Sequence, residues 1–205
     1  MKKNKLSKNW VIKNNRDFYY KASKTQGYRS RSAFKLIEIN EKFKFMKNNS
    51  NLLDLGSCPG GWSQVASKKI KKGKILAVDI KKMDNIPNVD FINGDFNDAK
   101  VQEKIKNYFN NSINVIISDM AVNTTGNKNL DSFRTGQISI EAMLLAQQYL
   151  ANDGIFLTKV FMGSIFKEIK ERASKIFKNI VIYKPLSSKK ESKEVYIFCK
   201  GILKV

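Results

Sequence analysis

Short apolar segments alternate with amphipathic ones along most of the chain. Runs of Leu, Ile, Val and Phe predict buried strands over residues 52–55, 75–80, 89–92, 113–118, 155–161, 180–183 and 195–199. Apolar positions spaced by three or four residues predict helices over residues 30–46, 61–71, 99–109, 132–150 and 165–177. Strands and helices therefore follow one another from residue 51 onwards, which indicates an α/β protein.

The apolar strands also indicate how the sheet is built. A strand that is apolar at successive positions is buried on both faces, as in a parallel sheet with helices on each side. The last two strands are joined by a polar segment, residues 184–193, that is too short for a parallel crossover. We therefore predict a Rossmann-like fold with a seven-stranded, mostly parallel sheet whose last strand is antiparallel, with helices on both faces. Ligands of such sheets bind at the carboxyl ends of the strands.

The composition removes several classes of chemistry. The chain has 205 residues and no histidine, which excludes Ser-His-Asp and Cys-His catalysis, imidazole bases and histidine metal ligands. Its two cysteines, Cys58 and Cys199, are too few for a zinc site or a disulfide framework, so no metal is expected. A content of 42% hydrophobic and 27% charged residues is that of a globular protein, and the length fits one domain.

Positive charge is concentrated in two segments that flank a nearly neutral centre. The net charge is +20, of which +10 lies in residues 1–35 and +6 in residues 167–193, against +3 in residues 36–166. Aromatic side chains are interleaved with the first segment. Clustered cations bind phosphates and aromatic rings stack on bases, so we expect a nucleic-acid partner. The organisation predicted is a basic arm over residues 1–27 and a single domain over residues 28–205.

Two other interpretations of the charge stay open. The arm can be merely solvated, and an anionic membrane surface is also a counter-charge for a basic protein. No apolar stretch approaches the ~20 residues of a membrane span, and no apolar core of a signal peptide follows the charged N-terminus. We therefore expect no membrane association.

A glycine-rich loop and three acids predict a cofactor site. In the loop after the first strand, Gly56 permits a tight turn, and Gly60 and Gly61 permit close approach of the backbone to a ligand. Asp79 at the second strand is placed to accept from ribose hydroxyls, and Asp95 and Asp119 follow the third and fourth strands. Each acid alone can be a helix cap or a turn residue. Together with the loop they favour a site for a nucleoside cofactor.

A second group of residues indicates chemistry beside this site. Lys159 lies inside an apolar strand, where a charge is costly unless it is paired. Lys35, Asp119 and Glu194 are its candidate partners, and the four side chains sum to zero charge. The alternative is that Lys159 belongs to an edge strand and extends into solvent, since spacing does not show that the four meet.

The motifs in this chain resemble the FtsJ/RrmJ family of ribosomal RNA ribose 2′-O-methyltransferases, from about residue 16 to residue 202. The matching segments are YRSRSAFKL over residues 28–36, LDLGSCPGGWSQ over 53–64, VDFINGDF over 89–96, SDMAVNTTG over 118–126, KVFMG over 159–163 and ESKEVYI over 191–197. The predicted sheet is likewise the class I methyltransferase variant of the Rossmann fold. Val122 departs from the proline usual in the family, and Cys58 from the alanine. A nucleophilic role for the Cys58 thiol is not expected, because its loop belongs to the cofactor.

The resemblance implies roles for the residues singled out above. The catalytic tetrad of the family falls on Lys35, Asp119, Lys159 and Glu194. Its S-adenosyl-L-methionine contacts fall on Gly60, Trp62, Asp79, Asp95 and Asp119 in this sequence. The implied reaction is in-line transfer of a methyl group to a ribose 2′-hydroxyl. Lys159 would act either as the general base, deprotonated more readily beside Lys35, or as a charged stabiliser of the oxyanion.

The resemblance also points to a target. Enzymes of the tRNA branch usually carry PGSW and DGAPD, whereas this chain has PGGW over residues 59–62 and DMAVN over residues 119–123. We therefore expect a methyltransferase of large-subunit ribosomal RNA, acting on a uridine of the assembled subunit as a monomer. The alternatives are a tRNA anticodon-loop methyltransferase and a non-catalytic RNA-binding assembly factor. The expected compartment is the cytoplasm for a bacterial source and an organelle for a eukaryotic one.

Overall fold

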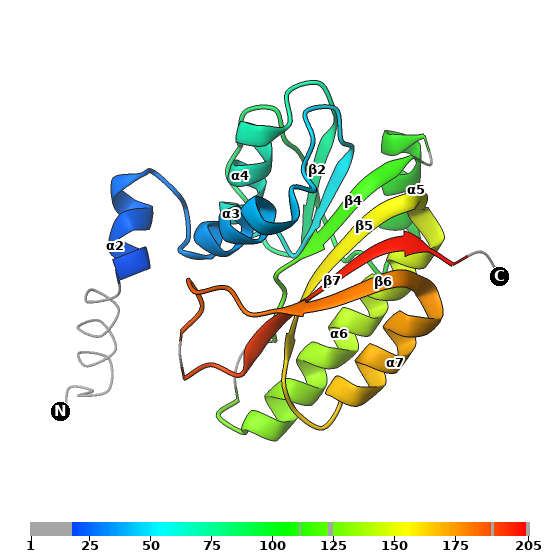
Figure 1. Cartoon of the computed structure of the whole chain (residues 1–205). Coiled ribbons are helices and arrows are strands. Elements are labelled where there is room, and N and C mark those ends of the chain that lie inside the picture. The colour runs from blue at the N-terminus through cyan, green and yellow to red at the C-terminus, as the bar shows by residue number, and fades with distance from the viewer. Residues whose placement is uncertain (1–17, 111, 123–124, 190, 204–205) are drawn as a thin grey trace.

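The computed structural model describes residues 18–110, 112–122, 125–189 and 191–203 (Figure 1). The elements in chain order are α2 (Phe18–Thr25), α3 (Ser32–Phe43), β1 (Leu52–Leu55), α4 (Gly61–Lys69), β2 (Ile75–Asp79), β3 (Asp90–Asn93), α5 (Ala99–Phe109), β4 (Ile113–Ser118), α6 (Lys128–Tyr149), β5 (Leu150–Phe161), α7 (Phe166–Ile176), β6 (Phe177–Tyr183) and β7 (Glu194–Ile202). All seven predicted strands and all five predicted helices are present.

The strands form one sheet in the order β3-β2-β1-β4-β5-β7-β6. The pairs from β3 to β5 are parallel, and β7 is antiparallel to both β5 and β6. The predicted fold class is therefore confirmed, including the antiparallel last strand. β7 lies between β5 and β6, which places Tyr196 opposite Lys159 in the sheet.

The helices cover the two faces of the sheet with two separate cores (Figure 1). On one face α5, α6 and α7 pack over buried side chains such as Ile116, Phe156 and Ile197. On the other face α3 and α4 pack over Leu52, Leu157 and Tyr196. Burial on both faces explains why the central strands are apolar at nearly every position.

Several boundaries differ from the predictions because caps and pairing decide where elements end. Helix α3 ends at Phe43, since Lys44 turns into the left-handed region with φ of 50° and its N–H bonds to Asn40 O. Helix α6 begins at Lys128, four residues early, because the Asn127 side chain accepts from the amides of residues 129 and 130. Strand β5 begins at Leu150, five residues early, and opens the pairing with β4.

Part of the predicted basic arm is helical. Residues 1–17 lie outside the described residues, but α2 follows them and packs on α3 through the rings of Tyr19 and Phe34, whose centroids are 5.5 Å apart. The arm over residues 1–27 stays a prediction, although its described end is attached to the domain. None of the described helices combines the length and apolarity that crossing a membrane requires.

Candidate active site

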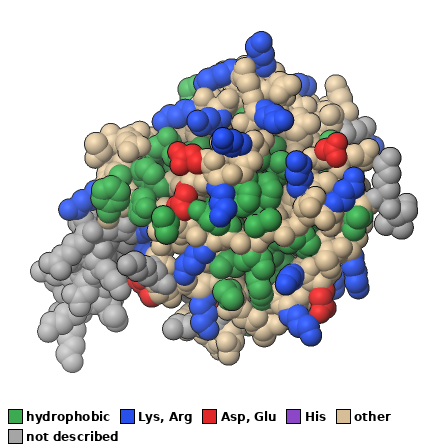
Figure 2. Space-filling model, in the orientation of Figure 1, with side chains coloured by type: hydrophobic (Ala, Val, Ile, Leu, Met, Phe, Trp, Pro, Cys, Tyr) green, Lys and Arg blue, Asp and Glu red, His purple; other side chains and the backbone are tan. Residues whose placement is uncertain are grey.

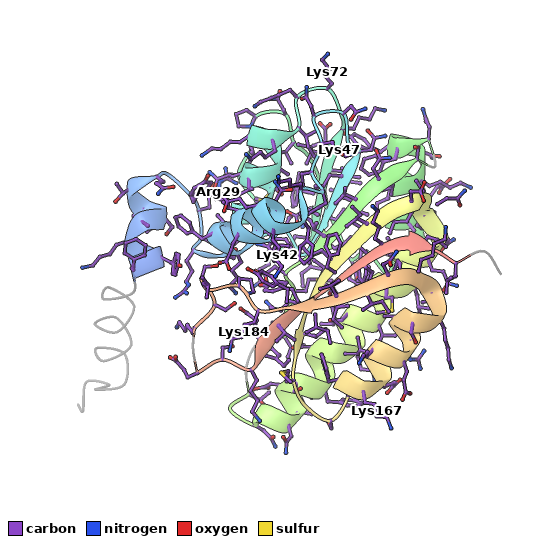
Figure 3. All side chains as sticks on the ribbon, in the orientation of Figure 1. Arg29, Lys42, Lys47, Lys72, Lys167 and Lys184 are labelled. Carbon is purple, nitrogen blue, oxygen red and sulfur yellow. The ribbon has the colours of Figure 1, made fainter. Side chains whose placement is uncertain are left out.

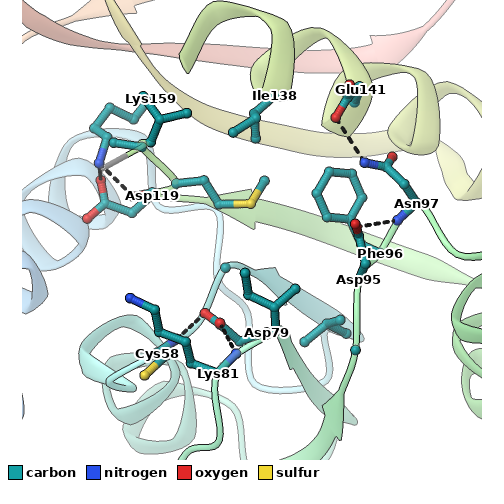
Figure 4. A pocket seen from close by; sticks show the side chains of 17 residues that line it. Cys58, Asp79, Lys81, Asp95, Phe96, Asn97, Asp119, Ile138, Glu141 and Lys159 are labelled. Atoms are coloured by element: carbon teal, nitrogen blue, oxygen red, sulfur yellow. Dashed lines mark hydrogen bonds and ion pairs between the residues drawn. The ribbon is translucent and has the colours of Figure 1, made fainter. Parts of the chain in front are cut away.

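A cavity of about 620 Å³ opens at the carboxyl ends of the parallel strands (Figure 4). It is lined by the loop after β1, the end of β2, residues 94–97 after β3 and residues 119–122 after β4. Lys159 of β5 and Glu141 of α6 close one side of it. The cavity lies at the edge of the sheet where the strand order predicted a ligand.

Asp79 ends β2 and is held by two main-chain amides. Its Oδ2 accepts from the N–H of Cys58 at 2.8 Å, and its Oδ1 accepts from the N–H of Lys81 at 2.7 Å (Figure 4). Each carboxylate oxygen has a second lone pair, so the amides fix the group and leave acceptor capacity toward the cavity. This is the arrangement that two neighbouring hydroxyl groups of a ribose require.

Asp95 follows β3 by two residues and also lines the cavity. Its Oδ1 accepts from the N–H of Asn97, and the Asn97 amide group donates to Glu141 Oε2, both at 2.9 Å. The side chains of Phe96 and Ile138 supply apolar surface beside these polar groups. A wall of this kind can hold a flat heterocycle whose amine donates to a carboxylate.

The glycines of the predicted cofactor loop have unequal positions. Gly56 lines the cavity with φ of 69°, and a Cβ there would overlap the Met120 side chain. Gly60 and Gly61 are buried outside the cavity lining, and a Cβ on Gly61 would overlap the Ser30 hydroxyl. These two glycines therefore permit close packing of the segment before α3 against the loop, and a direct contact with a cofactor stays a prediction for them.

Trp62 is also outside the cavity lining. It is buried, and its Nε1–H donates to Ser32 O at 2.9 Å. Its ring lies 5.7 Å from the ring of Tyr196. The tryptophan thus connects the start of α4 to α3 and β7, and its predicted cofactor contact is untested.

The four residues of the predicted catalytic group form two buried ion pairs. Lys159 Nζ lies 3.0 Å from Asp119 Oδ1 and also donates to the main-chain oxygen of Asp119 at 2.6 Å (Figure 4). Lys35 Nζ lies 2.7 Å from Glu194 Oε1. The side chains of Lys35, Glu194 and Lys159 are about one-tenth exposed, and that of Asp119 is 18% exposed. Lys159 is therefore a paired interior lysine, and the alternative of a solvent-extended edge lysine is wrong.

Tyr196 joins the two pairs, and the sequence reasoning missed it. Its ring is fully buried, its hydroxyl donates to Asp119 Oδ1 at 2.8 Å, and Lys35 Nζ lies 5.8 Å from its ring centroid. Tyr196 follows Glu194 by two residues on β7, so both side chains lie on one face of the sheet. That spacing is the signal by which the sequence could have indicated it.

The electrostatics of the pairs favour the ionised form of Asp119. Burial opposes ionisation, but the charges of Lys159 and Lys35 and the hydrogen bonds from Tyr196 and Lys159 outweigh it and lower the pKa of Asp119. Burial, with Asp119 and Glu194 nearby, raises the pKa of Tyr196 well above its usual value. The tyrosine is thus a hydrogen-bond donor to a carboxylate.

Asp54 in β1 behaves differently, and the sequence reasoning did not single it out. It is 1% exposed, and its Oδ2 accepts from the Ser63 hydroxyl at 2.6 Å. Burial raises the pKa of Asp54 to about 7, helped by the charges of Asp119 and Asp79 and opposed by the Ser63 hydrogen bonds. No lysine or arginine among the described residues forms an ion pair with it.

The thiol of Cys58 is unsuited to nucleophilic attack. Burial raises its pKa, and the neighbouring Asp79 carboxylate raises it further. A thiolate is therefore disfavoured at this position. Among the described residues no cluster of three or more cysteine or acidic side chains could hold a metal ion.

Comparisons with known proteins agree with this geometry. The family model described as FtsJ-like methyltransferase matches residues 28–202. The Pelagibacter ubique protein named ribosomal RNA large subunit methyltransferase E is 50% identical over 200 residues, which cover 98% of each chain.

Solved structures give the same picture. A Plasmodium falciparum protein described as a ribosomal RNA methyltransferase is 35% identical, with a TM-score of 0.78 over 86% of this chain and 99% of that one. A Streptococcus mutans protein described as a methyltransferase and solved with SAH has a TM-score of 0.51 at 16% identity, covering 80% of this chain and 96% of that one. The second likeness concerns the fold alone.

Proposed function

The chain belongs to the FtsJ-like methyltransferase family, and we propose that it methylates a ribose 2′-hydroxyl of large-subunit ribosomal RNA. It is an S-adenosyl-L-methionine-dependent methyltransferase, as the sequence predicted. The observation that carries the choice of a ribose hydroxyl is the buried Lys159–Asp119 pair on the wall of the cavity. A hydroxyl group needs help to lose its proton, and this pair presents an amine to the cavity.

The cavity fits the proposed cofactor. Asp79 is fixed by two amides with its acceptor capacity directed to the space, and Asp95 stands beside the apolar surface of Phe96. Gly56 keeps the loop after β1 close to Met120, where any side chain would intrude. We propose that Asp79 holds the ribose of the cofactor and that Asp95 holds its adenine amine. When bound, S-adenosyl-L-methionine supplies an electrophilic methyl group on a sulfonium.

The lysine pairs supply the rest of the chemistry. Lys159 has three N–H donors when protonated, and the two contacts to Asp119 orient its amine. As a neutral amine it accepts the proton of the 2′-hydroxyl, and as an ammonium it stabilises the oxygen while the proton leaves to water. Lys35 and Glu194 add a second pair that keeps the cluster neutral overall.

Ribosomal RNA is the substrate class that the similar proteins favour. The surface is compatible with a polyanion, because Lys and Arg side chains surround the apolar patches on the face seen in Figure 2 while acidic side chains lie at isolated points. Figure 3 places Lys42 on α3 and Lys184 after β6, both on this face. We propose that these cations contact phosphates, and that the assembled subunit is the substrate of a monomer.

Arg29 has a different use. Its guanidinium donates to the main-chain oxygens of Pro59, Asp84 and Asn85 at 3.3, 2.8 and 2.8 Å. It therefore ties the segment before α3 to the loops after β1 and β2, and we do not count it among the phosphate contacts.

The test is methyl transfer by the purified protein with labelled S-adenosyl-L-methionine. Three substrates are compared: large ribosomal subunits, protein-free large-subunit RNA and bulk tRNA. The products are digested to nucleosides and analysed by mass spectrometry. We expect a ribose-methylated nucleoside from the large subunit. Label on tRNA alone, or on a base rather than a ribose, would contradict the proposal, and label on free RNA but not on subunits would contradict the assembled substrate.

A further inference from the structure

Glu38 lies one helical turn after Lys35 on α3 and accepts four hydrogen bonds from the end of β6 and the loop that follows it. Its Oε1 accepts from the Tyr183 hydroxyl at 2.7 Å and from the N–H of Leu186 at 2.6 Å. Its Oε2 accepts from the N–H and the hydroxyl of Ser187, both at 3.0 Å. All four donors lie at the end of β6 or in the β6–β7 loop, residues 184–193, so one carboxylate attaches this loop to α3.

Ser188, the next residue of the loop, contacts the predicted catalytic group. Ser188 is buried, and its hydroxyl donates to Glu194 Oε1 at 2.8 Å. The same oxygen forms the ion pair with Lys35 at 2.7 Å. Lys35 and Glu38 are three positions apart and therefore project from one side of the helix. The loop thus links Glu38, through Ser187 and Ser188, to Glu194, the ion-pair partner of Lys35.

A second contact, from the residue that precedes α3, holds the same loop residue. Arg31 Nη2 donates to the main-chain oxygen of Ser187 at 2.7 Å. The N–H, the hydroxyl and the carbonyl of Ser187 are therefore all hydrogen-bonded, and the residue is 1% exposed. Its neighbour Leu186 is 85% exposed, so burial of Leu186 does not hold the loop in place. Three hydrogen bonds therefore tie Ser187 to Glu38 and Arg31.

The electrostatics agree with this arrangement. Glu38 is partly buried, which opposes its ionisation, yet the hydrogen bonds from Leu186, Tyr183 and Ser187 lower its pKa. The carboxylate is therefore ionised at neutral pH, when it accepts from all four donors. Charge-assisted hydrogen bonds of this kind are stronger than those between neutral groups.

We propose that Glu38 is a positioning residue for methyl transfer: through Ser187 and Ser188 it fixes Glu194 against Lys35. The role rests on the proposed function, because it assumes that the Lys35–Glu194 pair serves the reaction. Glu38 itself does not line the cavity. Its effect should therefore appear in the rate of transfer and not in the affinity for S-adenosyl-L-methionine.

The main variant is Glu38→Gln, which preserves the size of the side chain. A glutamine oxygen still accepts from Tyr183 and Leu186, but its NH₂ group faces the donors of Ser187. We expect the single-turnover rate on large ribosomal subunits to fall about tenfold, and the cofactor dissociation constant to change less than about twofold. The matched control is Glu41→Gln, an exposed position of the same helix, which should leave both unchanged.

A double-mutant cycle separates positioning from a general loss of stability. Ser188→Ala removes the hydroxyl that transmits the effect, so Glu38→Gln added to it should lower the rate by less than about twofold. Effects that simply add would overturn the proposal, as would a Glu38→Gln protein as active as the wild type. Thermal melting of all variants serves as the folding control.

Hydrogen exchange gives a readout that needs no activity. The amides of Leu186 and Ser187 should exchange faster in Glu38→Gln than in the wild type, while amides in β5 are unaffected. Unchanged exchange would overturn the proposed attachment. If the wild-type protein methylates no ribosomal RNA, the proposed function fails and the role of Glu38 falls with it. If the wild type is active and only the Glu38 results disagree, the positioning role alone is wrong.

Discussion

The carboxylates at the carboxyl edge of the sheet have different partners in two adjoining regions. In the region of Lys159, Asp119 and Glu194 each pair with a lysine at 2.7–3.0 Å, in surroundings that are largely buried. In the region of Asp79 and Asp95, the carboxylates accept from main-chain amides, and among the described residues neither forms an ion pair. In the first region the charges of the carboxylates are balanced by lysines. In the second region the carboxylates can still accept hydrogen bonds from a ligand.

The difference indicates that cofactor binding and methyl transfer depend on different carboxylates at the same edge of the sheet. A carboxylate fixed by amides can accept from the hydroxyl or amine groups of a ligand without first breaking a salt bridge. A carboxylate paired with lysine instead controls the position and protonation of that lysine. Substitutions in the paired region should therefore alter the rate of transfer, and those in the amide-bound region should alter cofactor affinity.

The largest effect is expected at Lys159. Lys159→Ala should lower the single-turnover rate by roughly 10²–10⁴, because the group that handles the hydroxyl proton is lost. Cofactor affinity should change little, since Asp79 and Asp95 are intact. The melting temperature should fall, because among the described residues Asp119 would keep only the Tyr196 hydroxyl as a side-chain hydrogen-bond donor. The measurement is rapid-quench methyl transfer at saturating cofactor.

A conservative change at the same position distinguishes the two roles of the lysine. A guanidinium keeps its charge but is not deprotonated. Substantial activity of Lys159→Arg would favour the charged, stabilising role, and an inactive protein with unchanged cofactor affinity is expected for a base. Wild-type rates in Lys159→Ala would contradict the division between the regions.

The next effect belongs to the amide-bound region. Asp79→Ala should weaken S-adenosyl-L-methionine binding at least about tenfold, since charge-assisted hydrogen bonds are worth roughly 1.5–3 kcal/mol each. The rate at saturating cofactor should stay within about threefold of the wild type, because a loss of uniform binding affects affinity alone. Isothermal calorimetry measures the affinity. Asp84→Ala, an exposed aspartate in the loop after β2, is the control.

Asp54 lies on β1, between the two regions, and the carboxylates of Asp119 and Asp79 both raise its pKa. The pH dependence of folding stability therefore tests the electrostatic effect of both regions on Asp54. Its raised pKa means that the folded protein binds a proton more tightly than the unfolded chain does. Folding stability from this group should therefore be highest below about pH 4 and decline as the pH rises toward 7, by about 1.4 kcal/mol for each pKa unit. Asp54→Asn cannot ionise and still accepts from Ser63.

The measurement is the melting temperature of both proteins at pH 5 and pH 8. We expect Asp54→Asn to gain on the wild type by about 5–10 °C at pH 8 relative to pH 5, since the two units from pH 5 to pH 7 amount to about 2.7 kcal/mol and about 1 kcal/mol shifts a domain of this size by ~2–4 °C. An equal difference at both pH values would show that Asp54 has an ordinary pKa.

The smallest effect is expected at the rim of the cavity. The hydrogen bond from Asn97 to Glu141 joins two exposed side chains, and such bonds contribute little. Glu141→Ala should weaken cofactor binding by no more than about threefold and leave the transfer rate unchanged. A tenfold loss in a calorimetric titration would instead place Glu141 in direct contact with the cofactor.

Much of the fold could be predicted from the sequence, because it depends on local patterns of burial and chain geometry. The apolar strands, the short connection before β7 and the acids at the ends of β2, β3 and β4 follow from burial and chain geometry, and all of these are found in the structure. The four charged residues of the catalytic group were also indicated, because a lysine in an apolar strand requires partners.

Other features depend on contacts between distant segments. Tyr196, Glu38 and Ser188 are ordinary residues in the sequence, and their importance arises only when β7 is inserted between β5 and β6. Gly61 and Trp62 were singled out in the sequence as cofactor-loop residues, but their packing against the α3 region is seen only in the structure. The pKa of Asp54 is likewise set by burial and by two carboxylates from other strands. Burial costs and strand direction are local properties, so the amino-acid sequence was enough to indicate which charges had to be paired and at which edge of the sheet a ligand binds. The side chains that hold those pairs in place emerge only from the folded chain, because the contacts between α3, β7 and the β6–β7 loop join distant positions such as Glu38 and Ser187, which are 149 residues apart.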